Sequence, residues 1–408
     1  MHSRKVNEVN TTRVLQKIWL SGGTTRVDLA RELGLVKSTV SRITTLLLEQ
    51  GIVRETTEKA VKSGVGRKPV LLRINERYGT IVGVEIQPDF FHAVVIDLHG
   101  RVVQEWSGRL SMSGSSVVSA FLEIMDPIYD WLEVAGTPLI GVGVALAGII
   151  DQNSGTVLQS NPLSLVEPVH FVRELRGRVP APVLVENDAN CGCWGELASR
   201  KTTRLRSFVF VLGEFRTGET ERSSYWGIAV GLGIVLNGEV YHGSSYSAGE
   251  FQSILWEPGN EGQFSITDAE ARRIKQDPVI MERALRELCS HVAFLVNTLN
   301  LKGVVFGGEI TGYKEMLLSI LDAEIQSNWA YPNRVEYQVE FSPFNELAIA
   351  YGAAGMYLES MFLIPELFPG HRETTRREIS VIRPAVPRRD EQWSASDATP
   401  DASTNEST

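Results

Sequence analysis

Two adjacent polar residues, Asn187 and Asp188, lie just after the apolar run Val183-Leu184-Val185, which is typical of a buried strand. In open α/β sheets, side chains at the carboxyl ends of strands line the ligand crevice. This position predicts a role for the pair in binding or chemistry. Asp188 also opens the helix that is predicted next, so on position alone a plain helix N-cap is an equal alternative for it.

The segments around this pair alternate between strands and helices, which predicts an α/β fold. Strands are predicted over residues 80–86, 93–97, 102–105, 139–147, 183–185, 208–212, 234–236 and 303–307, and helices over 117–134 and 169–176. The apolar strand over 139–147 ends at Gly148, so we place Gly148 beside Asn187 and Asp188 in the candidate ligand site. Glycines recur in the later strands, which suggests that a ligand or another backbone approaches closely there.

The basic residues gather at the start of the chain. The first 75 residues carry 14 Lys and Arg against 6 Asp and Glu, a net charge of +8, whereas the other 333 carry a net charge of −17. A basic module favours nucleic-acid phosphates, and an acidic body is repelled by them. We therefore expect residues 1–75 to form a DNA-binding domain with double-stranded DNA as its partner.

The spacing of apolar residues in this module predicts a helix-turn-helix. Helices are predicted over residues 12–20, over 26–33 with Thr24 or Thr25 as the cap, and from Lys37 to about Gln50. The third is the candidate recognition helix, because one face is apolar and the other is polar. The candidate DNA-contacting residues of these helices are Arg26, Lys37, Ser38, Thr39, Ser41 and Arg42. A three-helix bundle whose charges only solvate its surface is the alternative.

Two predicted strands, 52–54 and 69–74, follow the third helix and are joined by a basic, glycine-containing loop. A strand-loop-strand after a recognition helix is a winged helix. Within the loop, Arg67 is the best candidate for an arginine inserted into a narrow minor groove, with Lys68 beside it. A plain linker is the other interpretation of this loop.

The composition, 43% hydrophobic and 22% charged, is that of a globular protein with two or three domain cores. No run approaches the roughly 18 apolar residues of a membrane span, and the polar start lacks a signal-peptide apolar region. We therefore expect a cytoplasmic protein with no membrane partner. The three cysteines, Cys191, Cys193 and Cys289, are interpreted as reduced thiols. Residues 373–408 end in a stretch rich in Pro, Ser, Thr and Asp, and we expect a disordered tail there.

Several longer runs match one family in order along the chain. They are ENDAN at 186–190, GLGIVLNGEVYHG at 231–243, Ala248-Gly249-Glu250, VVFGGE at 304–309, and, upstream, LARELGLVKSTVSRITTLLLEQGIV and GRKP. Together they resemble the ROK family, whose members are sugar kinases or sugar-responsive repressors with an N-terminal winged helix. The resemblance reaches to about Leu363. It implies an actin-like ATPase fold, two α/β lobes around a cleft, over residues 76–372.

The resemblance also implies roles for individual residues. Asp188 matches the general base that takes a proton from the sugar hydroxyl in ROK kinases, and Asn187 and Glu250 match residues that hold sugar hydroxyls. Carboxylates and amides suit this task because each forms two directed hydrogen bonds to neighbouring hydroxyls. A sugar or sugar phosphate is therefore the expected effector.

The phosphate-binding equipment of the family is degraded in this chain. Where the family has an Asp-Leu-Gly-Gly-Thr type of turn, the sequence is Glu85-Ile86-Gln87-Pro88-Asp89, and the second phosphate loop reads Gly227-Ile228-Ala229-Val230-Gly231. Proline has no N–H and the added Asp repels phosphate, so ATP would not be held. The zinc cysteines of the family are missing after Glu250, so we expect no metal and no cofactor. Residues 214–224 form an insertion without a functional interpretation.

Three hypotheses follow. The first is a DNA-binding transcriptional repressor, a homodimer on its operator, whose ROK body is no enzyme and senses a sugar. The second is a sugar kinase that retains Asp188 and carries an appended DNA-binding domain. The third is a ligand-independent DNA-binding scaffold, because the supporting shell of the sugar site is altered.

Overall fold

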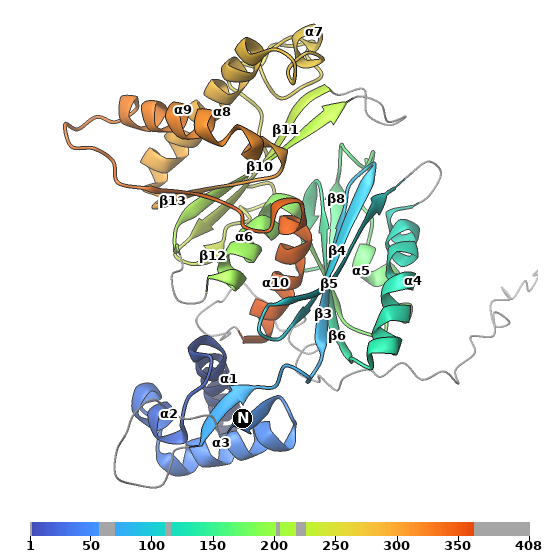
Figure 1. Cartoon of the computed structure of the whole chain (residues 1–408), viewed down its shortest axis with the longest axis vertical. Coiled ribbons are helices and arrows are strands. Elements are labelled where there is room, and N and C mark those ends of the chain that lie inside the picture. Colours follow the sequence, from blue (N-terminus) through green and yellow to red (C-terminus); the bar gives the residue numbers. More distant parts are fainter. Residues whose placement is uncertain (1, 57–69, 111–115, 201–204, 218–225, 363–408) are drawn as a thin grey trace, which may run out of the picture.

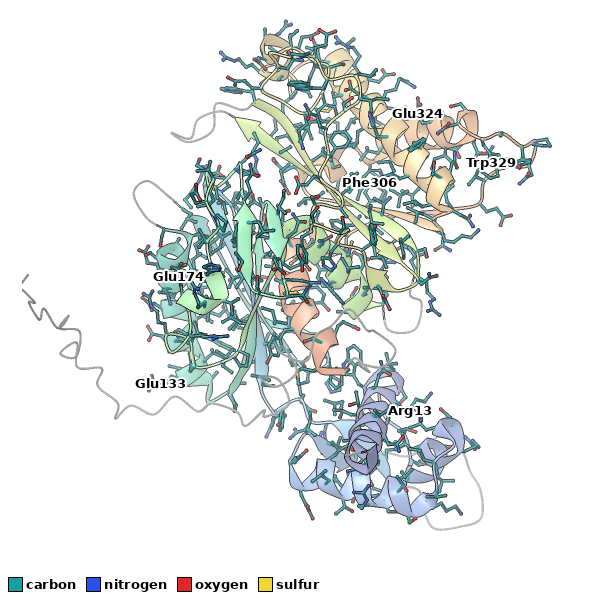
Figure 2. The ribbon with its side chains drawn as sticks, turned by 180° about the vertical axis from the view of Figure 1, so that it is seen from behind. Arg13, Glu133, Glu174, Phe306, Glu324 and Trp329 are labelled. Atoms are coloured by element: carbon teal, nitrogen blue, oxygen red, sulfur yellow. The ribbon has the colours of Figure 1, made fainter. Side chains whose placement is uncertain are left out.

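The computed structural model describes residues 2–56, 70–110, 116–200, 205–217 and 226–362. Three bodies follow one another along the long axis of the molecule: a small N-terminal module, a first α/β lobe and a second α/β lobe (Figure 1). Figure 2 shows Arg13 in the N-terminal module, low in the view, and Phe306 above it in the second lobe. No helix within the described ranges is long and apolar enough to cross a membrane.

The N-terminal module is a winged helix-turn-helix. Its elements are α1 (His2–Ser21), α2 (Arg26–Leu33), α3 (Lys37–Glu49), β1 (Val53–Thr56) and β2 (Leu71–Ile74), with β1 and β2 antiparallel. Thr25 caps α2 by accepting a hydrogen bond from the Asp28 N–H, and Gly34, at φ +64°, ends that helix. The three predicted helices are thus confirmed, although α1 begins ten residues before its predicted start. The predicted tail, 373–408, lies outside the described residues.

The first lobe is a five-stranded sheet in the order β5-β4-β3-β6-β9, in which β3, β6 and β9 are parallel. Its strands are β3 (Thr80–Ile86), β4 (Phe90–Asp97), β5 (Val102–Arg109), β6 (Leu139–Leu146) and β9 (Val183–Asn187), and its helices are α4 (Val117–Ala135) and α5 (Phe171–Glu174). A separate hairpin joins β7 (Ile149–Asp151) to β8 (Thr156–Gln159). This hairpin was not predicted, and the helix predicted over 169–176 is only the short α5.

The second lobe repeats this strand order as β12-β11-β10-β13-β14. Its elements are β10 (Phe208–Thr217), β11 (Trp226–Leu236), β12 (Glu239–Val240), α7 (Asp268–Ala271), α8 (Pro278–Leu299), β13 (Gly303–Gly307), η1 (Glu309–Tyr313), α9 (Lys314–Ser327) and β14 (Gln338–Phe341). In both lobes the first strand pairs antiparallel with the second and parallel with the fourth. β3 and β10 therefore hold equivalent positions. The two sheets define the two-lobed, actin-like ATPase fold that the family resemblance implies.

Helices α6 (Asp188–Ser199) and α10 (Ala348–Phe362) cross the middle of the molecule, where η2 (Asn345–Leu347) leads into α10 (Figure 1). A Cβ at Gly352 of α10 would lie 1.8 Å from the Cys191 carbonyl oxygen of α6. On the sheet side, a Cβ at Gly143 would lie 1.9 Å from the Ala353 carbonyl oxygen. Glycine at these points lets α10 contact both α6 and the first sheet at backbone distance.

The far end of α10 contacts the N-terminal module. The ring of Trp19 in α1 stacks on Phe362, with the centroids 4.5 Å apart, and the Trp19 indole N–H donates to the Leu98 carbonyl oxygen at 3.0 Å. Both rings are buried. The apolar core of the module is therefore continuous with the core of the first lobe.

Candidate functional site

A pocket of about 360 Å³ lies between the two sheets. Its lining comes from the carboxyl ends of β3, β6 and β9 in the first lobe and from β10, β11 and the segment after β12 in the second. The polar and charged residues of the lining include Asp89, Asn187, Asp188, Glu214, Arg216 and Glu250. Gly148, Asn187, Asp188 and Glu250, the four residues predicted for a ligand site, all line this pocket.

Asp188 is the first residue of α6 and is buried, with 8% of its surface exposed. Its Oδ1 accepts a hydrogen bond from the Ala189 N–H at 2.9 Å, and its Oδ2 accepts one from Gln87 Nε2 at 3.2 Å. Burial raises the pKa of Asp188, and these two hydrogen bonds oppose the rise only in part. A carboxylate oxygen has room for a second hydrogen bond, so Asp188 can accept one from a ligand hydroxyl.

Asn187, and not Asp188, is the N-cap of α6. Its Oδ1 accepts a hydrogen bond from the Asn190 N–H at 3.1 Å, and its Nδ2 donates to the Gly148 carbonyl oxygen at 3.0 Å. The plain N-cap interpretation of Asp188 is therefore wrong, because a helix takes one cap and Asn187 supplies it. The amide of Asn187 holds the β6 turn against α6 and keeps one donor for a ligand.

Gly148 follows β6 at φ +123°, a backbone region that favours glycine. A Cβ at this position would lie 2.4 Å from the Gln159 carbonyl oxygen of β8. The unpredicted β7–β8 hairpin thus packs directly against this edge of the pocket. Gly148 shapes the pocket through the close approach of two backbones.

Glu250 reaches the pocket from the second lobe, where it forms a bridge with Gly231 of β11. Burial raises the pKa of its carboxyl group, and the charge of Asp188 raises it further. No side chain or backbone group among the described residues donates a hydrogen bond to this carboxylate. Its oxygens are therefore open to hydroxyl or ammonium groups in the pocket.

Gln263 orders the segment that follows Glu250, and sequence reasoning missed it. Its Oε1 accepts from the Val230 N–H at 2.6 Å, while its Nε2 donates to the carbonyl oxygens of Val230 and Phe251 at 2.9 and 2.7 Å. One amide thus joins β11 to the backbone beside Glu250. In the same segment, His291 Nε2 accepts the Ile254 N–H at 3.0 Å, and the His291 ring lies edge-on to Phe251.

Two further polar groups were not predicted as site residues: Arg216, which lines the pocket, and Gln87, which is buried beside Asp188. Gln87 is fully buried at the end of β3, and Arg216 extends from the end of β10. They contact each other across the cleft, at 2.8 Å between the Arg216 Nη2 and the Gln87 Oε1. The insertion at 214–224 was the only sequence signal: its first four residues prolong β10 to Thr217 and carry Arg216 to the pocket.

A second candidate interface is the outer face of α3. Lys37, Ser38, Ser41 and Arg42 are exposed there, while Val40, Ile43 and Leu47 face the core, so the predicted division of the helix is confirmed. Thr39 is half-buried. The guanidinium of Arg42 also donates to the Asn7 side-chain oxygen of α1. The polar, exposed face of α3 keeps the chemistry that phosphate contacts would require.

The other three predicted DNA contacts, Arg26, Arg67 and Lys68, do not lie on the outer face of α3. Arg26 is half-buried and bonded within the module: its Nε donates to Thr44 at 3.1 Å and its Nη1 pairs with Glu55 at 2.9 Å. In the free protein Arg26 therefore ties α2 to α3 and β1. Arg67 and Lys68 lie outside the described residues, so the wing loop is known only from its sequence.

These observations define a class: a winged helix-turn-helix joined to a two-lobed α/β body with a polar pocket between the lobes. Residues 81–262 match the family model described as "ROK family".

Similar proteins span nearly the same length. The xylose repressor of Bacillus subtilis (strain 168) is 24% identical over 387 residues, which cover 87% of this chain and 96% of that protein. The DNA-binding transcriptional dual regulator NagC of Escherichia coli (strain K12) is 22% identical over 363 residues, covering 79% of this chain and 86% of that protein.

The solved structures establish the fold. A ROK family transcriptional regulator, described as a homolog of the E. coli MLC protein, superposes with a TM-score of 0.68 at 19% identity, covering 88% of this chain and 97% of that one. A ROK family glucokinase from Streptomyces griseus, in complex with glucose and AMPPNP, superposes with a TM-score of 0.53 at 19% identity, covering 68% of this chain and 99% of that one. The body thus has the fold shared by ROK regulators and kinases.

Proposed function

We propose that this protein is a sequence-specific DNA-binding transcriptional regulator of the repressor type, whose ROK body binds a sugar or sugar derivative. The observation that carries the proposal is that one chain contains both a DNA-binding fold and a ligand pocket. The first is a winged helix with an exposed polar recognition helix, and the second is lined by Asn187, Asp188 and Glu250. The repressors and regulators that match along most of the chain support it.

The chemistry of the pocket supports a polyhydroxylated ligand. The carboxylates of Asp188 and Glu250 come from different lobes, and both have lone pairs available to hydroxyl groups. A ligand that accepts both contacts joins the lobes, and a cleft closed in this way has a different shape from the open one. Such differential binding to two conformations is what a sensor needs.

We infer that the body transfers no phosphoryl group. That reaction depends on backbone N–H groups and cations that neutralise the nucleotide phosphates. At the first phosphate loop this chain places Pro88, which has no N–H, next to the negatively charged Asp89. Asp188, the residue that would act as the base, has its Oδ2 bound to Gln87 at this same end of the cleft. These features favour binding without catalysis.

A direct path joins the pocket to the DNA-binding module. α6 begins at Asp188, and α10 contacts α6 at backbone distance through Gly352. α10 ends at Phe362, which stacks on Trp19 of the N-terminal module. A shift of α6 on ligand binding would therefore move the carboxyl end of α1, where Trp19 lies. We propose that this path couples sugar binding to DNA binding, and that the operator is read by a homodimer, since half-sites are read by paired modules.

The test begins with selection of a DNA sequence from a random pool by the purified full-length protein. Binding of that sequence, with a scrambled duplex as the control, establishes sequence-specific recognition, and equal affinity for both duplexes would contradict it. Analytical ultracentrifugation of the complex distinguishes one copy per site from two. A sugar-kinase assay with ATP on the same preparation is expected to show no turnover; phosphorylation lost in Asp188→Asn would instead support an enzyme.

A further inference from the structure

Arg216 and Gln87 occupy matching places in the two lobes. Gln87 directly follows β3 and Arg216 lies at the end of β10, and β3 and β10 are the equivalent central strands of the two sheets. The Arg216 Nη2 donates to Gln87 Oε1 at 2.8 Å, and its Nη1 lies 3.9 Å from Asp89 Oδ1. With 15% of its side chain exposed, Arg216 is largely buried between the lobes.

This contact determines which way the Gln87 amide points. A guanidinium has only donors, so it accepts no hydrogen bond and must face the amide oxygen. The amide nitrogen then faces the opposite side, where it donates to Asp188 Oδ2 and Glu85 Oε1, both at 3.2 Å. If the amide were flipped, its oxygen would face two carboxylates, and the arrangement would be repulsive.

We propose that Arg216 is a positioning residue of the pocket: through Gln87 it holds the Asp188 carboxylate in place to accept hydrogen bonds from a neutral polyhydroxylated ligand. Arg216 does not need to touch that ligand. This inference rests on the proposed function for the identity of the ligand, but the ordering of Gln87 and Asp188 stands without it.

The charges around Arg216 explain why a cation is needed here. Four acidic groups interact with Arg216: Glu85 on β3, Asp89 after it, Asp188 on α6 and Glu214 on β10. Two more lie nearby, Glu250 in the pocket lining and Glu309 on η1, whose charge acts on Glu214. Lys275 pairs with Glu309 at 3.1 Å, away from Asp188. Within the described lining of the pocket, Arg216 supplies the compensating positive charge.

The pKa values of these carboxyl groups show the same balance. Burial and the charge of Glu309 raise the pKa of Glu214 to about 7, and the charge of Arg216 opposes the rise. Burial likewise raises the pKa of Asp188 and Glu85, again against Arg216. Loss of Arg216 would raise all three pKa values further. Among the described residues, the carboxylates of the pocket outnumber its one arginine, so an anionic ligand such as a phosphate ester would be repelled. The ligand class is therefore a neutral polyol.

The first arm of the test needs no sugar. Thermal unfolding of the full-length wild type, Arg216→Met and Arg216→Lys is measured at pH 5.5 and pH 8. Arg334→Met is the matched control, because Arg334 forms an exposed ion pair with Asp322 outside the pocket. Groups with a raised folded-state pKa lose stability as pH rises through that pKa. Arg216→Met should therefore lower the Tm more at pH 8 than at pH 5.5, by about 2–4 °C for each pKa unit added.

The expected pattern is a fall in Tm that grows with pH in Arg216→Met, is smaller in Arg216→Lys because the charge is kept, and is the same at both pH values in Arg334→Met. An Arg216→Met variant whose Tm falls equally at pH 5.5 and pH 8 would overturn the proposal, since a residue that only fills space acts independently of carboxylate charge.

The second arm is calorimetric titration of the same proteins with D-xylose and D-glucose at pH 6 and pH 8. A sugar bound by the wild type should bind Arg216→Met about tenfold or more weakly, with the larger loss at pH 6, where Asp188 becomes protonated more readily. An unchanged affinity in Arg216→Met would contradict the positioning role. If the wild type bound neither sugar, the sensing function would be in question, and the thermal arm alone would decide the role of Arg216.

Discussion

The two candidate interfaces of this protein carry charge in opposite ways. On α3 the cations Lys37 and Arg42 lie at the surface. Asp188 and Arg216, in contrast, are enclosed between the two lobes, and both are hydrogen-bonded to Gln87. Exposed charges act over distance and are screened by salt. Enclosed charges are shielded from salt but must be neutralised or protonated, so they respond to pH. The comparison predicts a DNA interface governed by salt and a ligand pocket governed by pH.

The largest effect is expected where a buried charge loses its partner. His242 Nε2 contacts Glu186 Oε2 at 2.7 Å, and Glu186 is completely buried. Burial alone lowers the pKa of His242, but the charge and hydrogen bond of Glu186 raise it above its ordinary value. His242→Gln should cost about 3 kcal/mol in unfolding free energy near pH 6, measured by denaturant titration.

This loss should shrink as pH rises. A histidine with a raised folded-state pKa contributes its full stability below the unfolded value of about 6.5, and the contribution disappears above the folded value. The matched control is His92→Gln, since His92 contacts the Ser107 hydroxyl on an outer hairpin. An equal cost of His242→Gln at pH 6 and pH 9 would break the proposed link between burial and pH response.

The next effect concerns the exposed cations. The double variant Lys37→Gln, Arg42→Gln should weaken binding of the selected DNA by about 10–100-fold at 0.1 M salt, because two phosphate contacts are lost. The slope of log affinity against log salt should become shallower by about 2. Fluorescence anisotropy over a salt series measures both.

The control for that experiment is Lys17→Gln, because Lys17 lies on α1 and is paired with Glu32 of α2 at 2.6 Å. Its salt slope should match that of the wild type. A double variant with weaker binding but an unchanged slope would mean that Lys37 and Arg42 act through structure and not through phosphate contacts.

Gln263 is an uncharged residue of the pocket, so its contribution to stability should depend on neither salt nor pH. Gln263→Met has nearly the same shape as the wild-type side chain but removes three hydrogen bonds to Val230 and Phe251. Leaving these groups unsatisfied should cost about 1–3 kcal/mol, by the same amount at pH 6 and pH 8 and at low and high salt. Denaturant unfolding under the four conditions tests this; a marked dependence on pH would assign Gln263 to the charged network.

The smallest effect is expected at an exposed ion pair. Arg54 in β1 donates to both oxygens of Glu76, at 2.9 and 3.1 Å, and both side chains are well exposed. Arg54→Gln should lower the unfolding free energy by no more than about 1 kcal/mol, and less in 1 M salt. A larger, salt-independent loss measured by thermal unfolding would show that exposure does not determine the strength of a pair here.

The sequence predicted well what local periodicity determines. The helices of the module, the polar face of α3 and the strands that deliver Gly148, Asn187 and Asp188 follow from apolar spacing and turn residues. It predicted less well the elements whose form depends on distant partners. α5 is shorter than its apolar residues suggested, and β7 and β8 pair with each other and pack against Gly148, a contact that strands of only three and four residues do not reveal.

The polar contacts of the site were the hardest to predict, since they join residues far apart in the chain. Arg216 bonds to Gln87 across 129 residues, and Gln263 bonds to Val230 across 33. The segment with Gln87 was interpreted only as a damaged phosphate loop, and Arg26 only as a DNA contact. In each case the side chain has a partner that only the folded chain places beside it.

The central claim is that a ligand between the lobes changes DNA affinity, and one titration tests it most directly. The full-length protein on its selected DNA is followed by anisotropy while neutral aldoses, including D-xylose and D-glucose, are added; Asp188→Asn is the matched variant. At least one sugar should change the wild-type Kd for DNA by about 5–150-fold, while Asp188→Asn keeps the sugar-free Kd and loses the response. A wild-type Kd that no aldose alters, or a response that survives in Asp188→Asn, would contradict the account.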